Sequence, residues 1–189
     1  MSIAKRIIEA YDKMNIGDAE AALIPASIAV DATAQKEYPD LNTGEAYKQF
    51  LHKNLELITR VAFGGNKAIT NSFRINYKHP KIKADKDGLC SIEQVWYHVV
   101  RCGLLHGGCL PSSLKFIWKT MIKVDDDLLV LPATLVYGLM FAVIASPVNI
   151  NETAPHNWGI TCGENRALLN DLWGKKDRLL KLFDPEKKT

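Results

Sequence analysis

The segment SIEQVWYHVVRCGLLHGG, residues 91–108, decides the fold because it carries signals for both ends of one helix. Ser91 followed three residues later by Gln94 forms a capping-box pattern, in which each side chain bonds a backbone group of the other at a helix start. The pair Gly107-Gly108 favours the end of the helix. We therefore predict a helix over residues 92–106, and we call it the motif helix.

The two sides of the motif helix differ sharply in composition. At about 100° per residue, one side collects residues suited to a core: Trp96, Val99, Val100, Gly103 and Leu104. The opposite side collects polar and titratable residues: Gln94, His98, Arg101, Cys102 and His106. A merely solvated face is normally built from lysine and glutamate, so this composition indicates a site for chemistry.

Arg101 and His106 form a pair suited to phosphate chemistry. A forked, permanently charged guanidinium can hold a phosphodiester and offset charge that builds on its oxygens. A histidine titrates near neutral pH and can take a proton from a hydroxyl or return one to a leaving oxygen. His106 ends its helix, where the helix dipole favours the protonated form. These residues are the predicted catalytic pair.

The sequence on both sides of the motif helix is mostly helical in pattern. Apolar residues recur at helical spacing over residues 2–14, 19–36 and 43–61, whereas residues 73–77 alternate apolar and polar as loops or short strands do. Residues 115–124 and 128–131 flank an acidic turn and predict a β-hairpin. A buried helix over 133–146 and an amphipathic helix over 164–183 are expected to follow.

These elements predict a mainly α fold, a single helical bundle of 189 residues with a small β-hairpin insertion. The expected order along the chain is N-terminal helices (1–63), an irregular insert (64–90), the motif helix (91–108), the β-hairpin (114–131) and C-terminal helices (132–183).

Composition sets limits on the class of protein. With 47% hydrophobic and 24% charged residues the chain is an ordinary globular one, and a net charge of +3 is less basic than is usual for dedicated nucleic-acid binders. Four cysteines without a C-x-x-C motif are too few for a disulfide scaffold. The charged N-terminal residues do not form a signal sequence. We predict a cytoplasmic protein.

Residues 128–151 contain no charged side chain and are long enough to cross a bilayer. Pro132 and Pro147 interrupt this stretch, and a helix that is apolar all round is also what a central buried helix looks like. The prediction is a buried helix, without contact with a membrane.

The motif helix resembles a known family. Arginine, four residues and then histidine, here Arg101-Cys102-Gly103-Leu104-Leu105-His106, is similar to the R-x4-6-H signature of the HEPN (higher eukaryotes and prokaryotes nucleotide-binding) superfamily, and the wider run from Trp96 to Gly108 also looks similar to bacterial members. Those proteins are helical bundles, and many are metal-independent endoribonucleases of toxin–antitoxin and defence systems. Cys102 stands where active members often carry Asn, Asp or His.

The resemblance implies a composite site where two motif helices meet in a homodimer. Arg101 would contact the scissile phosphate and His106 would transfer the proton. The resemblance further implies single-stranded RNA as substrate, no cofactor or metal, and a toxin or defence role that could involve an antitoxin or regulatory protein. Independently of the resemblance, Cys102, His98 and Asp31 are the candidate supporting residues beside this pair.

Two further features support an RNA site, each with an ordinary alternative. Asp31 interrupts an apolar helix, where it either orients Arg101 or faces water. A basic stretch could hold RNA through phosphate contacts and stacking, or could be a solvated loop. The candidate RNA-binding residues of this stretch are Arg74, Lys78, Lys81 and Lys83.

Two other interpretations compete with the nuclease. His98, Cys102, His106 and Cys109 have a spacing that could present ligands to zinc, although free cysteines more often pack as small apolar residues, and we predict no metal. The main rival is a non-catalytic HEPN-like interaction module whose polar face binds a nucleotide or a partner protein.

Overall fold

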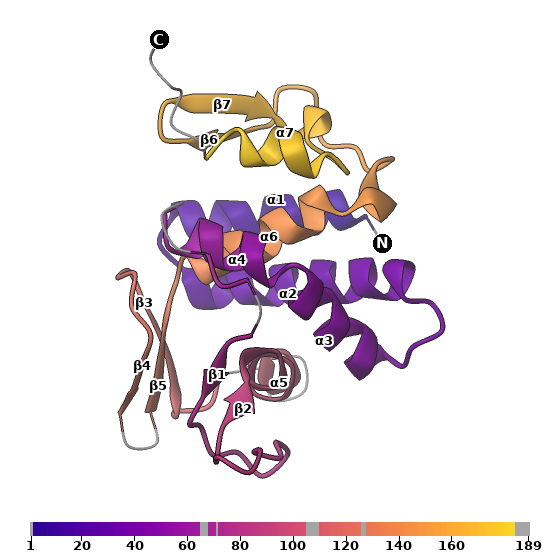
Figure 1. The fold of residues 1–189 in the computed structure, drawn as a ribbon. Helices are drawn as coiled ribbons and strands as arrows, with labels where there is room; N and C mark the ends of the chain where they lie inside the picture. The colour runs from indigo at the N-terminus through magenta and orange to yellow at the C-terminus, as the bar shows by residue number, and fades with distance from the viewer. Residues whose placement is uncertain (1, 65–67, 71, 105–109, 126–127, 184–189) are drawn as a thin grey trace.

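The computed structural model describes residues 2–64, 68–70, 72–104, 110–125 and 128–183 (Figure 1). The helices are α1 (Ile3–Asn15), α2 (Ala19–Glu37), α3 (Thr43–Lys53), α4 (Leu55–Ala62), α5 (Ile92–Val95), α6 (Leu135–Ala145) and α7 (Lys176–Leu180). The strands are β1 (Arg74–Ile75), β2 (Cys90–Ser91), β3 (Leu114–Ile117), β4 (Lys123–Asp125), β5 (Leu128–Pro132), β6 (Gly159–Cys162) and β7 (Asn165–Leu168). The fold therefore combines a helical core with three small sheets, and is more mixed than the mainly α bundle predicted.

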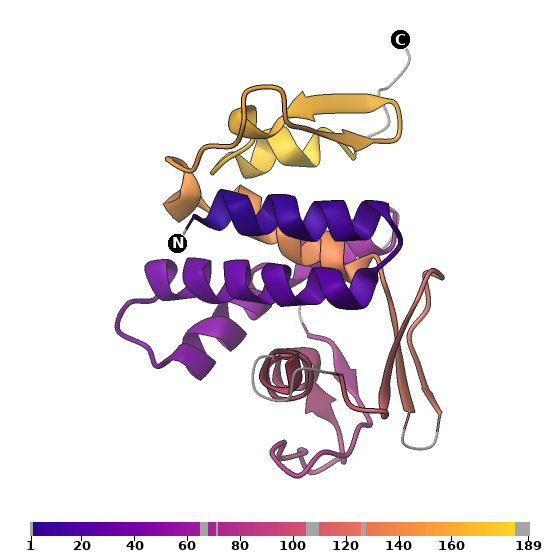
Figure 2. The same ribbon diagram turned by 180° about the vertical axis from the view of Figure 1, so that it is seen from behind.

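Helix α6 is the centre of the core, as predicted for a helix that is apolar all round. It packs against α1, α2, α4 and α7, and Figure 2 shows it behind the α1–α2 pair. The approach to α4 is especially close at Gly138, where an added Cβ would lie 3.0 Å from the carbonyl carbon of Ile58. Only glycine allows the two backbones to come this near.

The N-terminal helices follow their local signals. The Asp18 side chain accepts a hydrogen bond from the Ala21 N–H at 2.9 Å and begins α2, which continues as one helix through Pro25. The long helix predicted over 43–61 is two helices, because α3 ends at Lys53 and Asn54 separates it from α4. The Asn54 side chain donates to the Phe50 carbonyl at 2.9 Å, a local bond that competes with helix continuation.

The predicted β-hairpin is part of a three-stranded sheet with the order β3-β5-β4. Strands β4 and β5 pair antiparallel, as predicted. The prediction of one strand over 115–124 is wrong. Strand β3 ends at Ile117, β4 begins at Lys123, and β3 pairs parallel with β5. The intervening residues include Trp118 and Met121, whose side chains are exposed.

The C-terminal part differs from the amphipathic helix predicted over 164–183. Strands β6 and β7 form an antiparallel hairpin that turns at Gly163, whose φ is +60°. Only α7 and the 3-10 helix η4 (Leu169–Asp171) are helical there. Left-handed backbone at Gly163 and again at Gly174 (φ +71°) interrupts the helical pattern that the leucine spacing suggested. The leucines Leu169, Leu172 and Leu179 are nevertheless buried.

Residues 128–151 divide between β5, α6 and a short 3-10 helix, η3 (Pro147–Asn149). Among the described residues no helix has the length and apolarity required to cross a bilayer.

Candidate functional site

The motif helix begins as the sequence predicts. The Ser91 hydroxyl accepts a hydrogen bond from the Gln94 N–H at 3.3 Å, and the Gln94 side chain accepts one from the Ser91 N–H at 3.2 Å. After the single turn of α5, however, the chain continues as the π-helix η1 (Trp96–Arg101). Bonds from residue i to i+5 widen this turn, and π-helical turns occur frequently at functional sites.

The motif helix keeps the two faces that its sequence predicts. Trp96, Val99, Val100 and Leu104 are buried, whereas Gly103 is half-buried. The described polar residues Gln94, His98, Arg101 and Cys102 are half-buried. The predicted catalytic residue His106 and the glycines after it lie outside the described residues, so Arg101 is the described member of the catalytic pair.

Arg101 is held by Asp31 of α2. The guanidinium Nη2 donates to the Asp31 carboxylate at 2.8 Å, and the two side chains are 13% and 23% exposed. Burial by itself would lower the pKa of Arg101, but the hydrogen bond and charge of Asp31 outweigh it and raise that pKa. Of the two alternatives for Asp31, the structure therefore shows the one in which it orients Arg101.

This ion pair is incompletely satisfied within the described chain. Nε of Arg101 and Oδ1 of Asp31 are both buried and have no hydrogen-bond partner among the described residues. A buried polar atom without a hydrogen-bond partner costs free energy.

Tyr97 lies between two cations of the site. Its ring centroid is 5.5 Å from Cζ of Arg101 and 6.0 Å from Nζ of Lys48, which extends from α3. Gly44 makes room for this ring, since a Cβ there would lie 2.8 Å from the tyrosine hydroxyl oxygen. Aromatic rings attract cations that lie over their faces. Tyr97 thus joins the motif helix to α3.

His98 is the titratable group at the centre of a basic cluster, which we define as Lys48, His79, Lys81 and His98. Burial lowers the pKa of His98 first, and the charges of Lys48, His79 and Lys81 lower it further. The ring also packs edge-on against Tyr97 at 4.9 Å. The pKa of His79 is lowered as well, by burial and by Lys81, so the cluster presents two imidazoles that favour the neutral form beside two lysines.

The four candidate RNA-binding residues do not all belong to this cluster. Lys81 does, through its charge on His98. Arg74 is paired with Asp85 at 2.7 Å and lines one groove together with Lys83. Lys78 lines a different groove. The basic stretch is thus divided over separate surfaces.

The described cysteines are not placed for nucleophilic or metal chemistry. Burial raises the pKa of the Cys162 thiol to about 11, and Cys90 is buried. No group of three or more histidine, cysteine or acidic residues that could hold a metal ion occurs within the described ranges. His106 and Cys109, half of the zinc set considered from the sequence, lie outside them.

Sequence reasoning missed Tyr97, Lys48 and Gly44. Their importance follows from the crossing of α3 with α5 and η1, a contact between segments about 50 residues apart that no local pattern encodes. Of these three residues, only Tyr97 could have been found from the sequence, because it stands inside the motif segment next to His98.

The fold and the site together define a helical protein with small sheets that presents an arginine, a histidine and lysines beside a tyrosine ring. A family model matches residues 2–189, and the chain belongs to this family, the Rv1289 family. It is similar to uncharacterized protein Rv1289 of Mycobacterium tuberculosis and to uncharacterized protein Mb1320 of Mycobacterium bovis. Each is 22% identical over 175 residues, which cover 89% of this chain and 81% of the relative. No solved structure matches the chain significantly.

Proposed function

We propose that the chain is a metal-independent endoribonuclease that binds single-stranded RNA at the basic cluster beside the motif helix. The observation that carries the proposal is the position of His98, an imidazole of lowered pKa that lies near two lysines and a second histidine and packs against an aromatic ring. Lysines that contact phosphates are a usual component of a site for single-stranded nucleic acid, and the Tyr97 ring holds Lys48 and Arg101 beside His98.

RNA cleavage without a metal requires two proton transfers. In the proposed reaction the 2′-oxygen attacks the adjacent phosphorus while the bond from phosphorus to the 5′-oxygen breaks, leaving a 2′,3′-cyclic phosphate and a 5′-hydroxyl end. His98 is suited to accept the proton of the 2′-hydroxyl because its lowered pKa keeps it neutral. His106, which the sequence places at the end of the motif helix, would protonate the leaving 5′-oxygen.

In this proposal Arg101 does not contact the scissile phosphate, which is the role that the HEPN resemblance implies. Its Nη2 is already bonded to Asp31 and only 13% of its side chain is exposed. We assign it the role of placing Tyr97 and adding positive charge behind the phosphate, with Asp31 fixing its position. A second copy of the motif helix in a homodimer would complete the site, consistent with a toxin or defence effector controlled by an antitoxin or regulatory protein.

One observation favours the rival function, a non-catalytic HEPN-like module that binds a nucleotide or a partner protein. An arginine engaged by a carboxylate of its own chain can be a structural element, and an incompletely paired buried ion pair is compatible with that. In that case the basic cluster would bind its ligand and leave it intact.

Cleavage of single-stranded RNA in the presence of a chelator separates the two functions. We expect wild type to release fragments with cyclic phosphate ends, and His98→Gln and His106→Ala to lose about a hundredfold or more of the rate. His156→Gln removes an exposed histidine of the C-terminal part and is the matched control. If wild type and all variants leave RNA intact while RNA still binds, the interaction module replaces the nuclease.

A further inference from the structure

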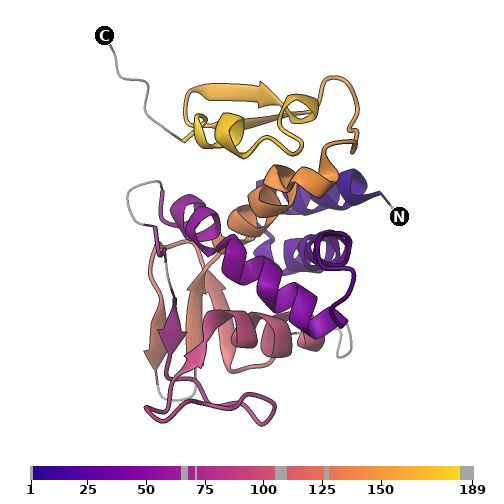
Figure 3. The ribbon, with the colours of Figure 1, turned by 45° about the vertical axis from the view of Figure 1, so that its right-hand side comes forward.

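The groove that Arg74 and Lys83 line lies between α3 and the segment that leads into the motif helix. Glu45, Lys48 and His52 line it from α3, and Arg74 and Lys83 line it from the insert. Figure 3 shows these elements side by side, with α3 crossing next to β1, β2 and α5.

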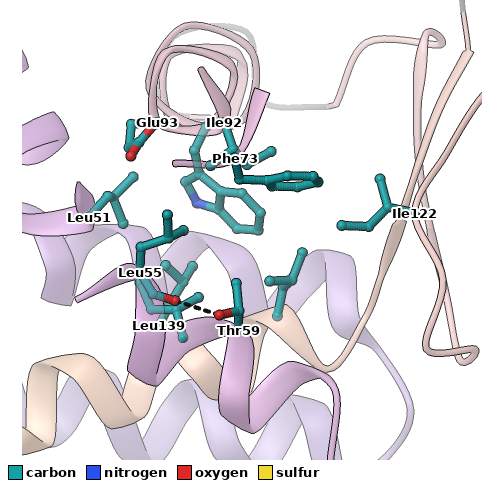
Figure 4. A pocket seen from close by; sticks show the side chains of 11 residues that line it. Leu51, Leu55, Thr59, Phe73, Ile92, Glu93, Ile122 and Leu139 are labelled. Carbon is teal, nitrogen blue, oxygen red and sulfur yellow. Dashed lines mark hydrogen bonds between the residues drawn. The ribbon is translucent and has the colours of Figure 1, made fainter. Parts of the chain in front are cut away.

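The groove contains a histidine that a buried carboxylate holds in place. Nδ1 of His52 lies 3.0 Å from Oε1 of Glu93, and Glu93 is only 5% exposed. On its other side Glu93 borders a small apolar cavity, where Figure 4 shows it near Leu51 and Ile92. A carboxylate buried against apolar side chains requires a polar partner, and His52 supplies it.

This contact determines how the imidazole is presented. An ionised carboxylate can only accept hydrogen bonds, so Nδ1 of His52 carries the hydrogen and Nε2 is left for another group. The His52 side chain is 57% exposed, which keeps Nε2 accessible from solvent. A histidine whose second nitrogen is fixed by a carboxylate is the arrangement that enzymes use to orient a proton-transfer group.

Three cationic side chains and three carboxylates line the groove, and contacts within it engage Arg74 with Asp85 and His52 with Glu93. Arg74 and Asp85 neutralise each other at 2.7 Å. Lys48 and Lys83 form no ion pair with a carboxylate in the part of the chain that the structure describes, and Glu45 is the opposing acidic residue of the lining. Two lysines can donate to oxygens of one tetrahedral anion, and Nε2 of His52 can accept a hydrogen bond from a protonated oxygen of the same anion.

We propose that this groove is a second ligand site, which binds a phosphate monoester in contact with His52, Lys48 and Lys83. Glu93 is its positioning residue. An imidazole that can give or take a proton at Nε2 distinguishes a phosphate monoester from sulfate, because phosphate has a second pKa of about 6 and sulfate carries no proton at neutral pH. The same argument disfavours a phosphodiester, so the site is separate from the proposed RNA site, which it meets at Lys48.

Inorganic phosphate and sulfate are the probes for this proposal, observed by nitrogen NMR of the histidine side chains in the full chain. The free protein should show His52 with its hydrogen on Nδ1. Phosphate should shift the Nε2 signal of His52 and bind about tenfold or more tightly than sulfate, which corresponds to roughly 1.4 kcal/mol. RNA is absent from this measurement, so its result does not depend on the nuclease.

Variants test which residues make the site. His52→Gln and Lys83→Met should each weaken phosphate binding severalfold, whereas Lys86→Met, which removes an exposed lysine that does not line the groove, should not. Glu93→Gln should remove the preference of His52 for the Nδ1 hydrogen and the selectivity for phosphate over sulfate. Equal binding of the two anions by wild type, or a His52 signal unmoved by phosphate, overturns the proposal whether or not the Glu93 variant folds.

Discussion

The ion pair between Asp31 and Arg101 can be tested by a double-mutant cycle. Removing one partner of a fully buried pair costs about 3–5 kcal/mol because the other charge is left without a counterion. The side chains here are 13% and 23% exposed, so solvent screens part of that cost. We expect Arg101→Met and Asp31→Asn each to lower the free energy of unfolding by about 2 kcal/mol, with a fall in Tm of roughly 4–8 °C for a chain of this size.

The double variant should be much less destabilised than the sum of the two single variants, because each substitution already removes the same contact. A coupling free energy of about 1–2 kcal/mol is expected. Urea unfolding followed by circular dichroism measures all four proteins. Arg60→Met is the matched control, since Arg60 pairs with Glu56 at 3.5 Å in a more exposed i,i+4 arrangement and should change stability by about 0.5 kcal/mol or less. A loss in Arg101→Met no larger than in this control would refute the burial argument.

The same variants distinguish the effect that the placement of Arg101 has on RNA cleavage from the effect of its charge. Asp31→Asn keeps the guanidinium but loosens it, whereas Arg101→Met removes it. If RNA cleavage is measured at a temperature where all proteins are folded, the arginine variant should be the slower of the two. Equal cleavage by wild type and Arg101→Met would remove Arg101 from the proposed site.

Three further predictions follow from individual contacts. Gly138→Ala should lower the free energy of unfolding by roughly 1–3 kcal/mol in urea unfolding, because the new methyl group meets the backbone of Ile58. Lys81→Met should raise the pKa of His98 toward its ordinary value in an NMR titration, because a positive charge that disfavours the imidazolium is removed. Alkylation of Cys162 at pH 8, followed by mass spectrometry of peptides, should be roughly a hundredfold slower than for a thiol of pKa 9.0, since its pKa of about 11 leaves little thiolate.

Each of these has a contrary result that is easy to recognise. An unchanged or increased stability of Gly138→Ala would mean that α4 and α6 are further apart than the structure places them. Lys86→Met is the control for the His98 titration, and an equal pKa change in both lysine variants would indicate a general charge effect. For Cys162, alkylation in urea should become fast, and fast alkylation of the folded protein would contradict the burial of the thiol.

The sequence predicts those parts of the fold that local interactions determine. The capping box of Ser91 and Gln94 and the buried helix α6 are both confirmed, because each depends on hydrogen bonds or hydropathy within a few residues. The helix predicted over 164–183 is wrong for the complementary reason. Its leucine spacing is helical, but the left-handed backbone at Gly163 allows a hairpin in which Leu168 is exposed, and the buried leucines follow that hairpin.

The candidate site shows the same division. A buried carboxylate in an apolar helix requires a partner, which is why Asp31 could be connected to Arg101 from sequence alone. The contacts of Lys48 with Tyr97 and of His52 with Glu93 could not be predicted, because both depend on the crossing of α3 with the motif helix. Neither pair has a spacing rule, since 49 and 41 residues separate their members.

Helix α3 determines the chemistry of both sites through one geometric property. Lys48 and His52 are four residues apart, so they lie on the same face of the helix, one turn from each other. Lys48 reaches Tyr97 in the π-helix, and His52 reaches Glu93 one turn earlier in α5. A uniform α-helical period does not hold through η1, because each π turn includes an additional residue. The face that α3 meets is therefore set by where α5 changes to η1, and the arginine–histidine spacing of the motif is only part of what arranges the polar residues.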